Sequence, residues 1–182
     1  IGEPCLAWII ENRVLAAALA ARLSQFPNID VLSPARVSSV QIGEEHVRVC
    51  LEGSRVLEAN LLVGADGAES RVRREAAIEW TRHDLLQSAI VGVVHTEHSH
   101  ARTAYQHFLA TGPLAFLPLD EPHTVSIVWS ADQTRAAVLL SLDDATFNVE
   151  LQAAFGDHLG RVRLVSERAA IPLALGFARD YT

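Results

Sequence analysis

The spacing of apolar residues changes along this chain, and the first change most constrains the fold. Residues 12–23 combine strong helix formers with leucines four residues apart, at Leu15, Leu19 and Leu23, which predicts one amphipathic helix. Asn12 stands where the N-cap of this helix is expected, because its side chain can accept from a free backbone N–H. From about residue 29 onward, apolar residues alternate with polar ones, the period of a half-buried β-strand. We therefore expect sheets to dominate the rest of the chain.

The first alternating region predicts a small sheet. Its apolar positions are Val37, Val40 and Ile42 in one run and Val47, Val49 and Leu51 in the next. Turn-forming residues at 43–45 and 52–54 separate the runs, which predicts a three-stranded antiparallel meander. A further apolar strand is expected over residues 60–64, and a short helix follows it and ends near Ala77.

Longer strand-like stretches follow residue 78. They cover residues 85–96, 103–119 and 123–130 and predict a second, largely antiparallel sheet. Helices are expected over residues 131–140 and 142–155, the second opened by Ser141, with Asp143 and Asp144 in its first turn, where the helix dipole favours carboxylates. A strand over residues 161–167 and an extended segment over 169–175 follow. The expected fold class is α+β or α/β, with a mixed, largely antiparallel sheet flanked by helices.

Composition excludes several classes of protein. The net charge of −7, with basic residues scattered among acidic ones, argues against a nucleic-acid partner. Cys5 and Cys50 form no disulfide framework, so a reducing, cytoplasmic setting is expected. No apolar run approaches the roughly 20 residues that cross a bilayer. Because the 182 residues contain no methionine and begin with Ile1, the chain is interpreted as a fragment of a longer protein.

The segment Gly64-Ala65-Asp66-Gly67 is the first candidate site. An apolar strand that leads into two glycines and a carboxylate places them at the carboxyl end of a strand, where open α/β sheets bind ligands. Glycine lets a ligand approach the backbone closely, and aspartate can accept from hydroxyl groups. The same four residues also fit a tight turn in which Asp66 is only a helix N-cap. The residues alone leave both interpretations open.

Two other groups of residues point to weaker candidates. The histidines of residues 95–100 include His98 and His100 at strand spacing, which could form a metal site, but a solvated loop is the preferred interpretation. Hydrolase chemistry has little support, because the chain has no Gly-x-Ser-x-Gly elbow. Trp129 lies in an apolar run and is expected in the core.

Several segments carry a family resemblance. Residues 62–73, LVGADGAESRVR, resemble the GADGxxSxVR fingerprint of flavin-dependent aromatic hydroxylases, the p-hydroxybenzoate hydroxylase-like group. The further segments similar to the ubiquinone-biosynthesis hydroxylase branch are residues 9–15, 111–119, 126–130, 171–173 and 178–181. They occur in the order of the family and together span nearly the whole chain.

The resemblance implies a division of the chain and a set of FAD contacts. Residues 1–78 would be part of an FAD-binding domain, residues 79–175 a substrate-binding sheet domain, and residues 176–182 a return toward the FAD domain. Asp66 and Gly67 would lie near the pyrophosphate and ribityl region of FAD, with Ser70 and Arg71 at the start of the supporting helix. Asn12 would contact the flavin. No catalytic residue is assigned, and the family uses no protein-bound metal.

Two parts of the family's flavin site are missing from this sequence. The Gly-x-Gly-x-x-Gly motif, which cradles the pyrophosphate, and the later Gly-Asp motif do not occur in the chain. The fragment alone is therefore expected to bind FAD weakly or not at all, and to be inactive.

The resemblance implies that the full protein is an FAD-dependent monooxygenase. It would use NAD(P)H and dioxygen to hydroxylate the ring of a phenol, in ubiquinone biosynthesis a polyprenylated one. Peripheral association with the inner membrane or with a ubiquinone-biosynthesis complex would follow from such a substrate, and a homo-oligomer is compatible with it. Two alternatives stay open: another flavoprotein of the superfamily that acts on small aromatics, and a non-catalytic binding or scaffold module.

Overall fold

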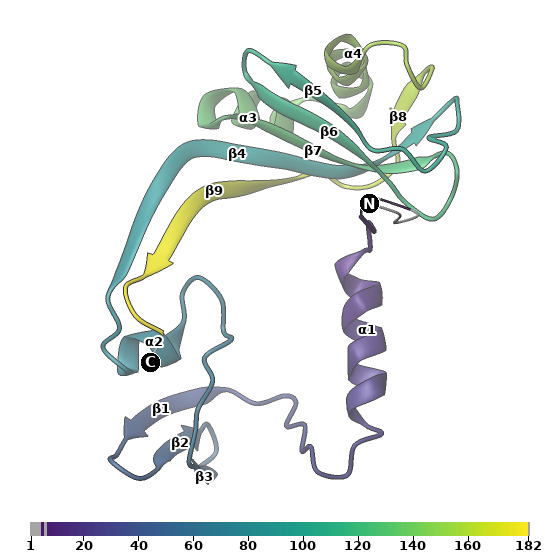
Figure 1. Ribbon diagram of the computed structural model, residues 1–182. Coiled ribbons are helices and arrows are strands. Elements are labelled where there is room, and N and C mark those ends of the chain that lie inside the picture. The colour runs from purple at the N-terminus through teal and green to yellow at the C-terminus, as the bar shows by residue number, and fades with distance from the viewer. Residues whose placement is uncertain (1–4, 6, 182) are drawn as a thin grey trace. The chain divides into compact units, whose positions relative to one another are not determined.

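The computed structural model describes Cys5 and residues 7–181, which form two compact units (Figure 1). The first contains residues 84–174 and the segment that ends at Ala18, and the second contains residues 19–83 and the segment that begins at Leu175. Each unit has its own sheet, and helices flank the larger one. The expected α+β class is confirmed, while the domain boundaries drawn from the family resemblance stay predictions.

The first unit is built on a six-stranded sheet. Its strands are β4 (Trp80–Thr96), β5 (Tyr105–Leu109), β6 (Gly112–Pro118), β7 (Thr124–Asp132), β8 (Val162–Leu164) and β9 (Ala169–Ala178). Their order is β5-β6-β7-β4-β8 with antiparallel pairs, and β9 also pairs with β4. The stretch expected over residues 103–119 is divided into β5 and β6 by a tight turn, with Leu109 opposite Gly112. The ends of β4 and β9 continue into the second unit.

The core of the first unit lies between this sheet and the helices α3 (Gln133–Ser141) and α4 (Asp144–Phe155) (Figure 1). Alternate residues of three neighbouring strands face the helices and are buried: Ile90, Val94, Leu114, Phe116, Val125, Ile127 and Trp129. From α4, Phe155 stacks on Phe116 with ring centres 3.6 Å apart. Trp129 is 2% exposed, so its expected place in the core is confirmed.

Aspartates cap both helices of this unit. Asp132 accepts from the N–H of Arg135 at 2.9 Å, and Asp143 accepts from the N–H of Thr146 at 2.7 Å. The hydrogen bond from the Thr146 N–H lowers the pKa of Asp143, because it stabilises the charged carboxylate. The expected helix start at Ser141 is wrong: Ser141 ends α3, and its hydroxyl donates to the Val138 carbonyl at 2.8 Å.

The second unit contains the expected meander. Its strands β1 (Val37–Ile42), β2 (Val47–Leu51) and β3 (Val56–Ala59) pair antiparallel in the order β1-β2-β3. Among the described apolar residues of this unit, only Val40 and Val49 are buried. The sheet therefore has a small apolar core, and polar contacts have a larger share in its order.

The prediction of a strand over residues 60–64 is wrong. The segment pairs with no strand of the described chain, and Leu61 and Val63 are 76% and 74% exposed. A strand needs a neighbour to satisfy its backbone N–H and C=O groups, and apolar sequence alone does not supply one.

The helix α1 (Asn12–Leu23) has the expected bounds, but its N-terminus differs. Asn12 is the first helical residue, and the preceding residue, Glu11, accepts from the N–H groups of Val14 and Leu15 through its carbonyl. The apolar stripe of α1 is exposed, since none of its residues is buried. The amphipathic pattern thus predicts the helix correctly without a covering surface in the part of the chain described here.

Replacement of Phe147 tests the core between α4 and the sheet. Phe147 is fully buried, so Phe147→Ala should lower the free energy of unfolding by about 3–5 kcal/mol. Val149→Ala on the same helix, where the side chain is 68% exposed, should change it by less than about 0.5 kcal/mol. Urea denaturation followed by circular dichroism measures both. Equal effects of the two variants would contradict this core assignment.

Candidate functional site

The candidate loop leads into the short helix α2 (Arg71–Glu75), and Ser70 and Asp66 hold the start of that helix. Ser70 is the N-cap: it is 6% exposed, and its hydroxyl accepts from the N–H of Arg73 at 3.0 Å. The same hydroxyl donates to one oxygen of Asp66. The other oxygen of Asp66 accepts from the backbone N–H groups of Arg71 at 2.6 Å and Val72 at 3.3 Å.

This arrangement determines what Asp66 does. The hydrogen bond from the Ser70 hydroxyl, and after it those from the Val72 and Arg71 N–H groups, lower the pKa of Asp66 below its ordinary value. Both carboxylate oxygens are thus engaged within the chain, and the carboxylate is charged at neutral pH. Of the two open interpretations, the geometry favours the turn, with Ser70 as the N-cap in place of Asp66.

The two glycines of the loop differ in their surroundings. A Cβ atom on Gly64 would lie 2.9 Å from the Cβ of Val72, so the absence of a side chain lets α2 pack against the loop. Gly67 has a φ of +81°, which L-residues rarely adopt, and a Cβ there would meet no atom within 4 Å. Gly64 therefore serves packing, while Gly67 supplies the positive φ of the turn, in which its carbonyl accepts from the Ser70 N–H at 3.1 Å.

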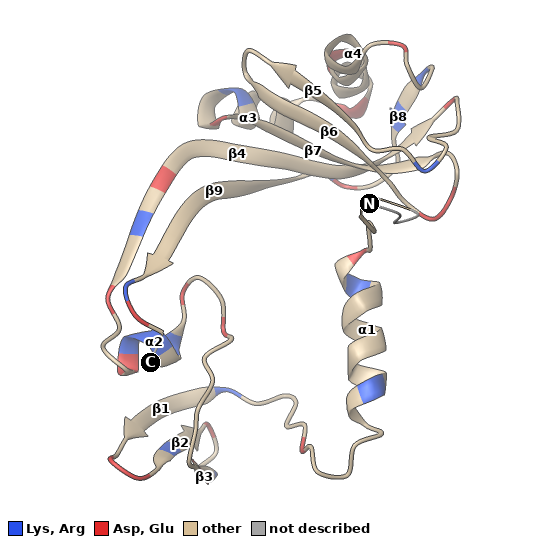
Figure 2. Cartoon of the chain, in the orientation of Figure 1, with Lys and Arg blue, Asp and Glu red and all other residues tan. Residues whose placement is uncertain are grey.

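Arginines of α2 bind the loop to the rest of the second unit, and Figure 2 shows these basic residues on α2. Arg71 donates to the Val37 carbonyl of β1 at 2.6 Å and lies 3.6 Å from the Glu75 carboxylate. Arg73 donates to the Ala68 carbonyl at 2.8 Å, and its guanidinium lies 4.3 Å from the ring centre of Trp80. The contact between Arg73 and Trp80 was not predicted from the sequence, because no periodic pattern links a residue of a short helix to the strand that follows it.

The predicted site residues fall into both units. Asp66, Gly67, Ser70 and Arg71 lie together in the second unit, whereas Asn12 is an exposed residue of α1 in the first. The structure therefore brings four of the five together. The contact of each with a flavin stays a prediction.

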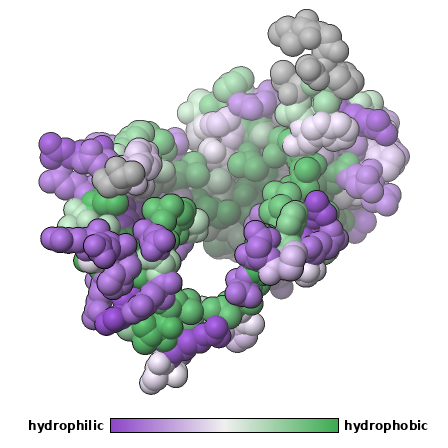
Figure 3. All heavy atoms as spheres, turned by 60° about the horizontal axis from the view of Figure 1, so that its bottom comes forward, coloured by the Kyte–Doolittle hydropathy of each residue, from purple (hydrophilic) through white to green (hydrophobic). Residues whose placement is uncertain are grey.

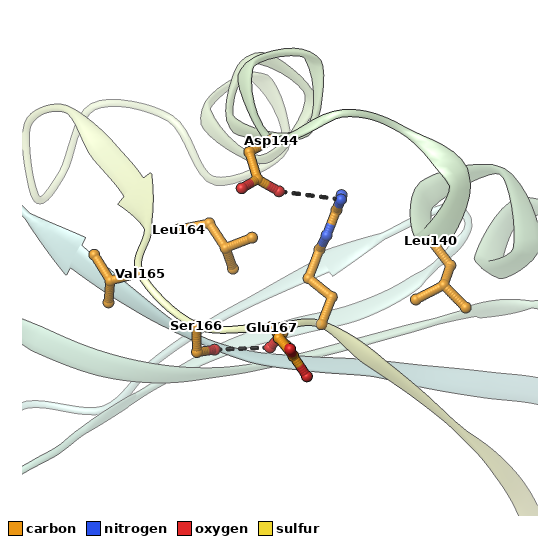
Figure 4. A pocket seen from close by; sticks show the side chains of 7 residues that line it. Leu140, Asp144, Leu164, Val165, Ser166 and Glu167 are labelled. Atoms are coloured by element: carbon orange, nitrogen blue, oxygen red, sulfur yellow. Dashed lines mark hydrogen bonds and ion pairs between the residues drawn. The ribbon is translucent and has the colours of Figure 1, made fainter.

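The first unit also contains a pocket of about 640 Å³ between α3, α4 and the loop after β8 (Figure 4). Leu140, Asp144 and residues 164–168 line it. The side chain of Arg168 donates to the carbonyls of Leu139 at 3.1 Å and Leu142 at 2.6 Å, and to Asp144 at 3.2 Å. Arg168 therefore ties β9 to the α3–α4 connection, and we assign it a structural role.

The histidine segment differs in part from the expected solvated loop. His95 and His98 are exposed, but His100 is 3% exposed. Its Nδ1 accepts from the Arg102 N–H at 3.0 Å, so its Nε2 donates to the Glu121 carbonyl at 3.0 Å. His100 is thus a hydrogen-bonded core residue. Among the described residues, no group of three or more His, Cys, Asp or Glu side chains is arranged to hold a metal ion.

The sequence profile of the FAD binding domain family matches residues 4–182. The chain belongs to this family. Ubiquinone hydroxylase UbiL of Rhodospirillum rubrum is 38% identical over 97% of the chain, and 3-demethoxyubiquinol 3-hydroxylase of Escherichia coli is 31% identical over 98%. The aligned region covers 41% and 45% of these relatives, so the chain spans less than half of their length. The resemblance to ubiquinone-biosynthesis hydroxylases is confirmed.

Solved structures of flavoproteins share the fold of this chain. PqsL of Pseudomonas aeruginosa, a probable FAD-dependent monooxygenase, superposes with a TM-score of 0.71 at 23% identity, over 87% of this chain and 46% of PqsL. p-Nitrophenol 4-monooxygenase PnpA of Pseudomonas putida gives 0.68 at 15% identity, over 92% of this chain and 43% of PnpA. At these identities the likeness concerns the fold alone.

In this FAD binding domain chain, the polar groups around Asp66 are in part occupied by hydrogen bonds within the loop. The N–H groups at the start of α2 are engaged by Asp66, so they cannot also bind a phosphate. At Gly67 an added Cβ atom would meet no atom within 4 Å, while the Gly67 carbonyl accepts from the Ser70 N–H at 3.1 Å. Asp66, Ser70 and Arg71 are accordingly positioning residues, which hold the loop in shape.

Asp66→Asn tests the role of the carboxylate. Because folding lowers the pKa of Asp66, its stabilising contribution is present above the ordinary Asp value and is lost as pH falls through the lowered value. The wild type should therefore be more stable than Asp66→Asn near pH 7, and the difference should shrink below about pH 4. Urea denaturation across this pH range measures it. Asp30→Asn, an exposed residue of the same unit, is the matched control, and an equal pH dependence there would refute the assignment.

Gly64→Ala tests the close approach of α2 to the loop. The added methyl group would meet the Cβ and Cγ1 of Val72 at 2.9 and 3.0 Å, so the variant should lose about 1–3 kcal/mol of unfolding free energy. Val72→Ala removes the Cγ1 atom, and the double variant should recover part of the loss. A double-mutant cycle from thermal unfolding gives this coupling. Purely additive effects would show that the two positions do not compete for space.

Proposed function

We propose that the protein containing this chain is an FAD-dependent monooxygenase that hydroxylates the aromatic ring of a prenylated phenol in ubiquinone biosynthesis. The observation that carries the proposal is the Asp66 loop, ordered by its own hydrogen bonds, in a chain of the FAD binding domain family. The relatives named ubiquinone hydroxylase and 3-demethoxyubiquinol 3-hydroxylase support the choice of pathway.

The residues of this chain bind and orient, and the cofactor supplies the redox chemistry. FAD, when bound, would carry electrons from NAD(P)H to dioxygen. Gly67 would lie next to the cofactor, while Asp66 and Ser70 keep the loop backbone in place. Arg71 fixes α2 to β1 through the Val37 carbonyl, so the loop and the meander move as one body. We propose Asn12 as a further flavin contact.

The open face of the larger sheet is the proposed substrate wall. Residues of β4, β6 and β7 that alternate with the buried ones lie on the face away from α3 and α4; they are Val91, Val93, Ala115, Leu117 and Val128. All five are partly exposed. In Figure 3 hydrophobic side chains are visible in several places on the surface, among hydrophilic ones. The five apolar side chains suit an apolar substrate such as a polyprenylated phenol.

Charge on these strands distinguishes a neutral phenol from an aromatic acid. A site for a carboxylate substrate is expected to supply an arginine. The strands β6 and β7 and residues 85–96 of β4 contain no Arg or Lys. This composition favours a neutral, prenylated phenol over the alternative of small aromatic acids.

A prenylated substrate resides in a membrane, so we propose peripheral association with the inner membrane or with a ubiquinone-biosynthesis complex. Within the described residues, no helix is both long and apolar enough to cross a bilayer. A homo-oligomer is compatible with the proposal.

A non-catalytic scaffold is the second candidate, because both carboxylate oxygens of Asp66 are hydrogen-bonded within the chain without a ligand. Such a module would keep its stability when FAD is added and would not oxidise NAD(P)H. The two candidates therefore separate in one assay.

The assay measures NAD(P)H oxidation and product formation by the full protein with FAD, with a prenylated phenol or with p-hydroxybenzoate. We expect hydroxylated product with the prenylated phenol and little with the acid. Val128→Asp places a charge on the proposed wall and should lower kcat/KM by about tenfold or more, roughly 1.4 kcal/mol or more. Val149→Asp, on the exposed side of α4, is the control and should leave kcat/KM unchanged. A flavin-free protein without turnover would support the scaffold, and preference for the acid would support the small-aromatic alternative.

A further inference from the structure

We propose that the outer edge of β5 pairs with β5 of a second copy of this chain, so that the larger sheets of the two copies become continuous. β5 (Tyr105–Leu109) is the first strand in the order β5-β6-β7-β4-β8, and Figure 1 shows it at the border of this sheet. Among the described residues, β5 pairs with β6 alone. This interface is independent of the flavin chemistry proposed above.

Pro113 of β6 determines which backbone groups of β5 face outward. Phe108 lies opposite Pro113, which has no N–H, so these two residues form a non-hydrogen-bonded pair of the ladder. Because hydrogen-bonded and non-hydrogen-bonded pairs alternate, Gln106 and Ala115 form another non-hydrogen-bonded pair. The backbone N–H and C=O groups of Gln106 and Phe108 therefore point away from β6. No turn or loop backbone in the described part of the chain hydrogen-bonds to them.

The other end of the strand order is closed by helix side chains. On β8, the N–H of Val162 donates to the side-chain oxygen of Gln152 at 2.9 Å, and the N–H of Leu164 donates to that of Asn148 at 2.8 Å. Both side chains come from α4. β5 has no neighbour of this kind within the described residues, so its edge can still pair with a strand from another chain.

The free groups of β5 match those of a second β5. In an antiparallel pairing centred on His107, Gln106 of each copy lies opposite Phe108 of the other. Each of these pairs can exchange both of its N–H···O=C hydrogen bonds, so all of the free groups of both strands find a partner. The two His107 residues would lie opposite each other at the two-fold axis as a non-hydrogen-bonded pair. This self-match makes a second copy the partner that fits the edge.

The side chains of β5 also permit this pairing. The strand sequence YQHFL contains no Lys, Arg, Asp, Glu or Pro, the residues with which edges commonly prevent pairing. His107 stacks on Phe155 of α4, so Gln106 and Phe108 lie on the face of the sheet away from the helices. Phe108 is 83% exposed, and in this register the Phe108 rings of the two copies are diagonal neighbours within reach of each other. Pairing would therefore cover an aromatic side chain that is open to water in the single chain.

The length of β5 determines the strength of association that we expect. A pair of strands of 5 residues is small beside the roughly 800 Å² that each partner buries in an interface of standard size. The dimer should therefore be reversible and form as the protein concentration rises.

Sedimentation velocity of the full protein, from about 1 µM to about 1 mM, measures this association. Phe108→Glu and Gln106→Lys each place like charges close together at the axis, so each should weaken association about tenfold or more. The double variant should recover much of the affinity, because each new lysine lies opposite a new glutamate of the other copy.

Val149→Glu is the matched control, since it places the same charge on an exposed apolar residue of α4, and it should leave association unchanged. Circular dichroism confirms that each variant is folded. A protein that stays monomeric over the whole range, whether another segment covers β5 or the edge stays free, would overturn the proposal. A dimer that Phe108→Glu leaves intact would overturn it too, as would a double variant that associates no better than the single variants.

Discussion

Burial of one face of the larger sheet under α3 and α4 is the interaction on which the first unit depends. Strands β4, β6 and β7 each give every second side chain to this layer, and α4 closes it with Phe147, Leu151 and Phe155. Because a strand's side chains alternate, this burial also decides which residues are left on the opposite face. The residues of the proposed substrate wall therefore lie on the opposite face as a direct consequence of this packing.

The second unit is stabilised differently. With Val40 and Val49 as its buried apolar residues in the described chain, it has little hydrophobic burial to hold its loops. Charge-assisted hydrogen bonds stabilise these loops instead. The Asp66 carboxylate accepts from the N–H of Arg71 at the start of α2, and the Arg71 side chain donates to the Val37 carbonyl of β1. Such bonds are stronger than neutral ones, and they impose geometry. The loop that is proposed to meet the cofactor therefore also contributes to the order of its unit.

Local pattern predicted much of this structure. The leucine spacing of α1 and the alternation of β1 and β2 are local signals, and all three elements were confirmed. The segment at residues 60–64 has an equally apolar sequence, but a strand needs a partner, and no property of the segment says whether one exists. The burial of His100 also escaped prediction, since its partner Glu121 is 21 residues away. For the loop, the sequence and the family resemblance together selected Asp66 and Ser70. Which groups donate and which accept in their hydrogen bonds became known only from the structure.

The hydrogen bonds of Asp66 have a consequence for how this position can change over time. A carboxylate that only touched a cofactor could be replaced once the cofactor was no longer used. Here both oxygens are engaged by Ser70, Arg71 and Val72, so the residue stabilises the fold whether or not a ligand is bound. The motif would then persist in a descendant that had lost its flavin, and its presence in a sequence records the architecture more securely than the activity.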